Sequence, residues 1–183
     1  MILKKIIIAI IMLMIFTGCE NDLMNTPTKR VETLMTNYIT LDEEVLRDLD
    51  ETLLTETVMT PNQKDRYRDI LKRQYQHLSY EIKDETIDGD NATVSVEIEV
   101  YDYNKVINEA NTYLNDNPNE FIQEDNNITD VSKFNDHKLN MLENTKDKVT
   151  YTLNLTLSKE DDKWVLDDLT DTEISKIHGM YTY

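Results

Sequence analysis

Two stretches of strict alternation constrain the fold of this chain more than any other feature of its sequence. Apolar and polar side chains alternate from Thr93 to Val100 and again from Val149 to Leu157. Because successive side chains of a strand point to opposite faces, each stretch predicts a strand with one apolar and one polar face. Such strands are typical of an antiparallel sheet that is covered on one face and solvated on the other.

Each of these two strands has a predicted hairpin partner. Residues 80–84 alternate and lead to Asp88-Gly89-Asp90-Asn91. This composition is typical of a hairpin turn, because glycine supplies a positive φ and Asp and Asn tolerate one. After the second strand, the polar residues 159–163 lead to Trp164-Val165-Leu166, which we interpret as a closing strand.

Helical patterns precede the first hairpin. Residues 31–39 and 42–54 carry apolar side chains at helical spacing, and Asp42 can cap the second of these helices. Thr60-Pro61-Asn62-Gln63 is a capping box with proline at the first helical position, where its missing N–H costs nothing. It predicts a third helix whose apolar face extends to Leu78.

Helices also separate and follow the hairpins. Asp102 can cap a helix that reaches Leu114, the chain breaks around Pro118, and a second helix covers 131–142 after a polar stretch at 120–130. A capping box at Thr170-Asp171-Thr172-Glu173 predicts a short helix that ends near Gly179. The fold class is therefore predicted as α+β: N-terminal helices packed on a curved, mostly antiparallel sheet, with a helical insertion between the hairpins.

The first residues have the features of an export signal. Lys4 and Lys5 precede an apolar run from Ile6 to Phe16, which is followed by Thr17-Gly18-Cys19. The run has about 11 residues, whereas a span of the bilayer core needs about 20. A secretory signal is therefore favoured over a permanent transmembrane helix.

The end of this segment, Phe16-Thr17-Gly18-Cys19, resembles the bacterial lipobox, in which an aliphatic residue usually stands where Phe16 does. The resemblance implies cleavage before Cys19, a diacylglycerol on its thiol and a lipid anchor on the extracytoplasmic face of the cell membrane. Cys19 is the only cysteine, so no intramolecular disulfide can form. The alternative is an ordinary signal followed by a chance cysteine.

These features divide the chain into three parts. Residues 1–18 are predicted as a lipoprotein signal peptide, 19–28 as a polar lipidated tether, and 29–183 as one α+β domain. Two acyl chains anchor a protein stably without further contacts to the bilayer.

The composition is strongly acidic. The chain has 19 Lys and Arg against 36 Asp and Glu, and loss of Lys4 and Lys5 with the signal makes the net charge about −19. Nucleic acid is excluded as a partner, because its binding depends on basic residues. Anionic headgroups repel such a domain. The surface is either simply solvated or attracts cationic ligands or metal ions.

Motifs for chemistry are scarce. The only cysteine is assigned to lipid, and three glycines are too few for a phosphate-binding loop. His77, His137 and His178 each stand alone, which predicts structural or surface roles, and a charged His178 would suit a helix C-terminus. Calcium is a further hypothesis for residues 88–91 and 124–127, although turn chemistry explains both stretches. No cofactor is predicted.

The order of elements, ending in Lys163-Trp164-Val165-Leu166-Asp167, resembles the NTF2-like, cystatin-related cone fold of lipoproteins from Gram-positive bacteria. The resemblance covers about residues 29–178, and the helical insertion departs from it. Some cones of this type are isomerases and cyclases with a carboxylate and a tyrosine in an apolar pocket. The candidates here are inward-facing tyrosines beside Asp84, namely Tyr80, Tyr101, Tyr103 and Tyr151, which are also explained as residues at the edge of the core.

The resulting functional expectation is a non-enzymatic module of the cell envelope that binds a ligand or another envelope protein. The alternative is an NTF2-like small-molecule isomerase or hydrolase that uses a pocket carboxylate and a tyrosine. A third possibility is a spacer whose acidic surface keeps the domain soluble.

Overall fold

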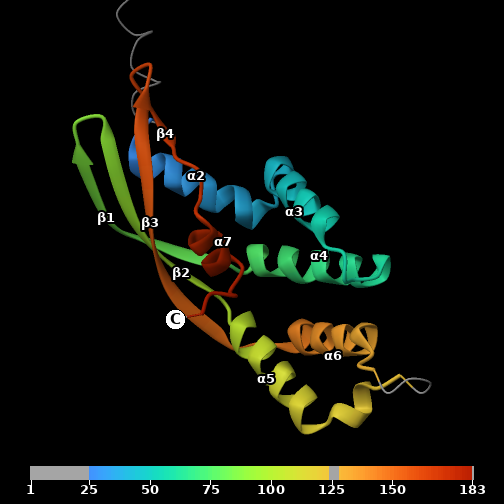
Figure 1. The fold of residues 1–183 in the computed structure, drawn as a ribbon. Coiled ribbons are helices and arrows are strands. Elements are labelled where there is room, and N and C mark those ends of the chain that lie inside the picture. Colours follow the sequence, from blue (N-terminus) through green and yellow to red (C-terminus); the bar gives the residue numbers. More distant parts are fainter. Residues whose placement is uncertain (1–24, 124–127, 183) are drawn as a thin grey trace, which may run out of the picture.

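A four-stranded antiparallel sheet with helices on one face organises the chain in a computed structural model that describes residues 25–123 and 128–182 (Figure 1). The predicted signal peptide, Cys19 and most of the tether lie outside the described residues, as does the stretch 124–127. In chain order the elements are α2 (Pro27–Thr40), α3 (Glu43–Thr55), α4 (Pro61–Gln76), β1 (Ser79–Asp88), β2 (Asn91–Tyr101), α5 (Tyr103–Asp116), the 3-10 helix η1 (Pro118–Phe121), α6 (Val131–Asn144), β3 (Lys148–Glu160), β4 (Lys163–Leu166) and α7 (Asp171–Ile177).

The sheet has the simple order β1-β2-β3-β4, and each pair is antiparallel. The two alternating strands are its centre: Val94 pairs with Leu155 and Ile98 with Tyr151, so their apolar side chains share one face. These side chains are buried, whereas Thr152 and others on the opposite face are exposed. The prediction of an antiparallel sheet with one covered and one solvated face is confirmed.

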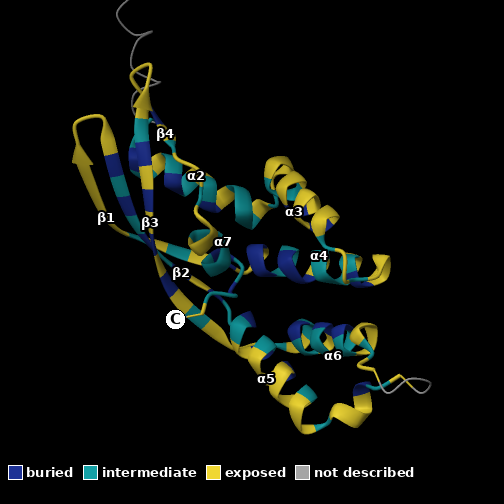
Figure 2. Cartoon of the chain, in the orientation of Figure 1, coloured by how far each residue is buried: buried dark blue, intermediate teal, exposed yellow. Residues whose placement is uncertain are grey.

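Helix α2 covers the apolar face of the sheet, where its Val31 and Met35 are fully buried (Figure 2). Helices α3 and α4 form a further layer beside it, and α7 closes the C-terminal side of the same core (Figure 1). The predicted α+β class, with N-terminal helices on a mostly antiparallel sheet, is confirmed.

The predicted starts of α3, α4 and α7 are confirmed by their caps. Asp42 accepts a hydrogen bond from the Glu44 amide at the start of α3. Thr60 and Gln63 form the reciprocal capping box of α4, and Thr170 and Glu173 form that of α7. Each box satisfies amide groups that a helix start leaves without partners.

The first helix begins earlier than predicted. Pro27 occupies its first turn and Thr26 caps it, so the end of the segment assigned to the tether belongs to the folded domain. The Asn25 side chain accepts a hydrogen bond from the Trp164 amide, and Thr28 donates to Glu85 on β1. Proline suits the first turn of a helix, which explains this extension.

The insertion between β2 and β3 is the predicted helical one, formed by α5, η1 and α6. It packs against α4 through a second hydrophobic cluster made of Ile70, Tyr103, Val106, Leu139 and Leu142.

Polar contacts reinforce the packing of the insertion against α4. Arg66 of α4 binds Glu143 and Asp136 of α6. Arg73 of α4 donates to the carbonyl oxygens of Leu142 and Glu143 at the end of α6. Helix α4 therefore belongs to both hydrophobic clusters and joins them.

Candidate ligand pocket

A pocket of about 560 Å³ lies among the N-terminal helices and the C-terminal segment. We call it the helix pocket. Six parts of the chain line it: α2, α3, the end of α4, the end of β4, the β4–α7 connection and α7 with its cap. Its lining residues are Leu34, Asn37, Tyr38, Glu44, Val45, Asp48, Leu49, Thr52, Tyr75, Leu166, Asp167, Asp168, Leu169, Ile174 and His178.

The floor of the helix pocket is aromatic. Tyr75 is buried, and its ring packs edge-to-face with that of Tyr38 at a centroid distance of 5.0 Å and an angle of 71°. The Tyr75 hydroxyl lies 2.8 Å from Nε2 of His178, whose ring centroid is 5.7 Å away. The three rings come from α2, α4 and the cap of α7, so the tertiary fold creates this group.

Electrostatics distinguish the floor from the rim. Burial lowers the pKa of His178 to about 4, so this ring is neutral at neutral pH. The expectation that its charge complements the helix dipole is therefore wrong, because desolvation outweighs the favourable end of a short helix. Burial, assisted by the negative charge of Asp48, raises the pKa of Tyr38 to about 12 and also raises that of Tyr75. Both phenols are protonated at neutral pH.

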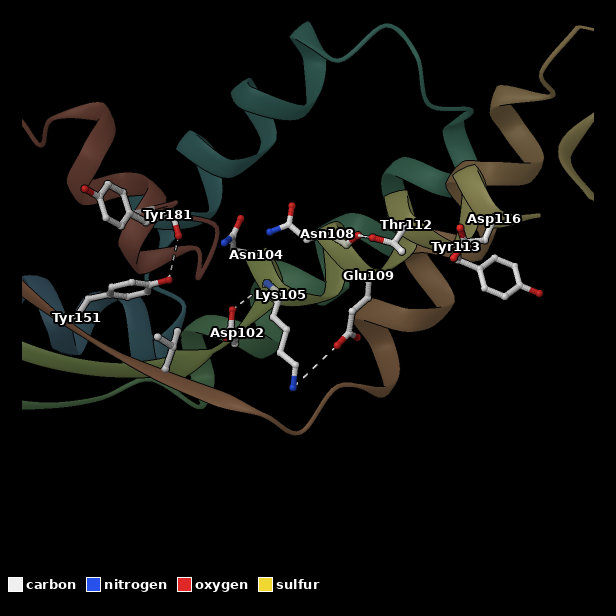
Figure 3. Close-up of a pocket in the computed structure, with 11 residues that line it drawn as sticks. Asp102, Asn104, Lys105, Asn108, Glu109, Thr112, Tyr113, Asp116, Tyr151 and Tyr181 are labelled. Carbon is white, nitrogen blue, oxygen red and sulfur yellow. Dashed lines mark hydrogen bonds and ion pairs between the residues drawn. The ribbon is translucent and has the colours of Figure 1, made fainter. Parts of the chain in front are cut away.

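A second hollow of about 610 Å³ runs along α5 and is drawn in Figure 3. Its side chains are spread along the helix, and Tyr113 points away from the others. Lys105 ion-pairs with Asp147 at 2.5 Å and lies 4.0 Å from Glu109. Tyr151 donates to the carbonyl oxygen of Tyr181 at one end. These groups do not converge on one point, so the helix pocket is the better candidate site.

The structure does not bring together the tyrosine–carboxylate set suggested by the sequence. Asp84 is exposed, because a bulge makes Lys83 an extra residue in β1 and places Asp84 opposite Ser95 rather than Val94. A one-residue slip moves a side chain to the other face of a sheet, and here it moves Asp84 to the solvated face.

The four tyrosines of that set lie in three different places. Tyr80 is half-buried at the edge of the main core. Tyr101 and Tyr103 stack at 6.0 Å near Arg73, and Tyr103 donates to the Ile70 carbonyl oxygen. Tyr151 lies on β3, where it lines the second hollow, the one that runs along α5.

The other two histidines have structural surroundings. His77 is exposed at the end of α4, where its Nδ1 lies 2.9 Å from the Arg73 carbonyl oxygen. His137 stacks on Tyr113 at 4.7 Å in the insertion. The predicted structural or surface roles of these residues fit their positions.

Among residues 25–123 and 128–182, no group of three or more His, Cys, Asp or Glu side chains could hold a metal ion. Residues 88–91 form the β1–β2 turn with Gly89 at a φ of 61°, and the second calcium candidate, 124–127, lies outside the described residues. No helix in the described part of the chain is long and apolar enough to cross a membrane.

The sequence contained a partial signal for the helix pocket. Tyr38 and Tyr75 both appear on predicted apolar helix faces, where they are indistinguishable from ordinary core residues. The contact of Tyr75 with His178 depends on packing between segments more than 100 positions apart. Neither spacing nor composition reports such a contact.

Comparison with family models, with curated proteins and with solved structures finds no match to this chain. Its function must therefore be inferred from its own residues.

Proposed function

We propose that this protein is a lipid-anchored lipoprotein of the extracytoplasmic membrane face whose domain binds a small ligand without chemical turnover. The observation that carries the binding role is the helix pocket, an opening of about 560 Å³ with a polar rim and an aromatic floor of the buried Tyr75 and the half-buried Tyr38 and His178. Ligand sites are typically concave, largely apolar and of this size, with a few polar groups that fix orientation.

The lipid anchor is supported by the sequence around Cys19 and is tested through that residue. Cys19→Ala should leave the protein unprocessed or release it from membranes, because no thiol remains to accept lipid. Phe16→Leu is the matched control: it restores the usual aliphatic residue and should be processed at least as well. Membrane fractionation and the mass of the mature chain report both. Unchanged processing and attachment of Cys19→Ala would contradict the anchor.

Within the α+β class, we propose that the domain has an NTF2-like cone fold. It is supported by the order of three helices, a hairpin, an insertion and a second hairpin, with α2 on the apolar face of the sheet. In this arrangement the helix pocket lies between the N-terminal helices and the C-terminal segment.

Catalysis is less well supported than binding. A general acid or base of the isomerase type works in a desolvated site. The carboxylates that line the helix pocket, Glu44, Asp48, Asp167 and Asp168, are all exposed. No contact among the described residues favours the isomerase, hydrolase, protein-binding or spacer alternatives over ligand binding.

Pocket filling tests the binding role. Neutral, anionic and cationic small molecules are screened by thermal shift against the wild type, Val45→Trp and Val58→Trp. Val45 lines the pocket, whereas Val58 is exposed outside it. Compounds that stabilise the wild type and Val58→Trp but not Val45→Trp support a ligand site there. Thr52→Trp, at an exposed rim position, repeats the test if Val45→Trp unfolds. Equal stabilisation of all variants, or none of any, would contradict the proposal.

A further inference from the structure

The charge of the helix pocket is one-sided. Four carboxylates line it, those of Glu44, Asp48, Asp167 and Asp168. No lysine or arginine in the described ranges lines it with them. Arg47 approaches Glu44 and Asp48 at 3.1 and 3.7 Å, but it lies outside the lining and all three side chains are exposed. Exposed pairs of this kind contribute little energy and exchange readily with solvent.

The aromatic floor complements this negative rim. The faces of tyrosine rings attract cations, and the attraction grows when the site is desolvated. Tyr38 lines the pocket and is half-buried, whereas Tyr75 beneath it is buried and packs against it at 71°. The neutral ring of His178 adds no positive charge. Burial is the main cause of the raised pKa values of the two phenols, and the negative charge of Asp48 adds to it.

We propose that the helix pocket binds a small organic cation whose ammonium group lies between the Tyr38 ring and the acidic rim. This inference rests on the proposed ligand-binding function and names the ligand class of the same pocket. Anions are disfavoured because four carboxylates repel them. A bare metal ion is disfavoured because the described residues contain no metal-ligating cluster and the floor is aromatic and apolar. Alkylated ammonium groups match both features, since their charge is spread over an apolar surface.

Choline and its uncharged isostere 3,3-dimethyl-1-butanol test this inference, because they differ in charge and hardly in shape. Calorimetric titration into the full chain in detergent should give choline an affinity about tenfold higher, the effect expected of one cation–π contact with a nearby carboxylate. Asp48→Asn, which keeps the shape of the rim, should weaken choline binding about fivefold.

Glu51→Gln is the matched control for Asp48→Asn. It removes the same charge from α3 at an exposed position outside the lining, and it should change choline binding by less than about twofold. Equal affinity for choline and its isostere, or equal weakening by the two substitutions, would overturn the inference. If an anion or a neutral compound binds and Val45→Trp abolishes that binding, only the choice of ligand class fails. If no compound binds, the proposed function fails with it.

Discussion

At the scale of single residues, Gly179 has no room for a side chain. Its φ is 69°, and a Cβ there would overlap the Tyr101 carbonyl oxygen and the Gln74 side chain. The buried Gln74 amide also holds the end of β2, since it accepts from the Tyr101 amide and donates to its carbonyl. Gly179 thus allows the C-terminal segment to approach the point where α4 meets β2.

Gly179→Ala should therefore reduce the free energy of unfolding by about 3 kcal/mol or more, because it combines backbone strain with a clash against backbone atoms. Gly89→Ala is the control: its φ is 61° but nothing lies within 4 Å of the added Cβ. It should cost about 1 to 2 kcal/mol from strain alone. Urea unfolding measures both, and equal losses would contradict the predicted clash.

His178 gives a prediction for pH. Its pKa is about 4 in the folded protein, lowered from 6.5 by burial. The unfolded chain therefore binds more protons between these values, so the stability linked to this group is complete above about pH 6.5 and is lost as the pH falls towards 4. The loss between about pH 7 and pH 5 should be about 2 kcal/mol. His178→Gln should remove this part of the pH dependence in urea unfolding, and an unchanged slope would contradict it.

At the scale of elements, α4 is the helix that joins the two hydrophobic clusters. It shares one core with the sheet and a second with the insertion, and Arg73 bridges to the end of α6. An arginine that donates to the last carbonyl groups of a helix satisfies acceptors that the helix itself leaves open.

Arg73→Ala should lower the free energy of unfolding by about 2 kcal/mol, the usual value for hydrogen bonds from a charged group in a partly buried site. Arg68→Ala on the same helix is the control. Its ion pair with Asp50 is more exposed, so its loss should cost less than about 1 kcal/mol. Thermal and urea unfolding of the two variants test the difference, and a larger effect of Arg68→Ala would show that Arg73 does not join the layers.

Elements were predictable where the signal was local. The alternation of β2 and β3, the two capping boxes and the Asp-Gly turn are all determined by neighbours in sequence, and the structure confirms them. The bulge at Lys83 was not predictable from the pattern, because Tyr80, Ile82 and Asp84 continue an unbroken alternation. The bulge places Asp84 on the solvated face of the sheet, so the candidate site that depended on Asp84 does not form.

At the scale of the whole molecule, the site could not be predicted from the sequence because it is a product of packing. Tyr38, Tyr75 and His178 come from three helical segments, and each has the features of an ordinary core or cap residue within its own segment. The acidic composition predicted only an overall field. What the fold adds is the concentration of four carboxylates around one aromatic floor.

The insertion also has a consequence for how the chain finds its structure. Residues 102–147 separate β2 from β3, yet these strands form the central pair of the sheet. The pairing requires closure of a long loop, which is slow unless structure within the loop first brings its two ends close together. Docking of α6 against α5 brings Tyr101 and Lys148 to adjacent positions. We therefore expect the local pairing of α5 with α6 to precede the long-range pairing of β2 with β3 and to accelerate it.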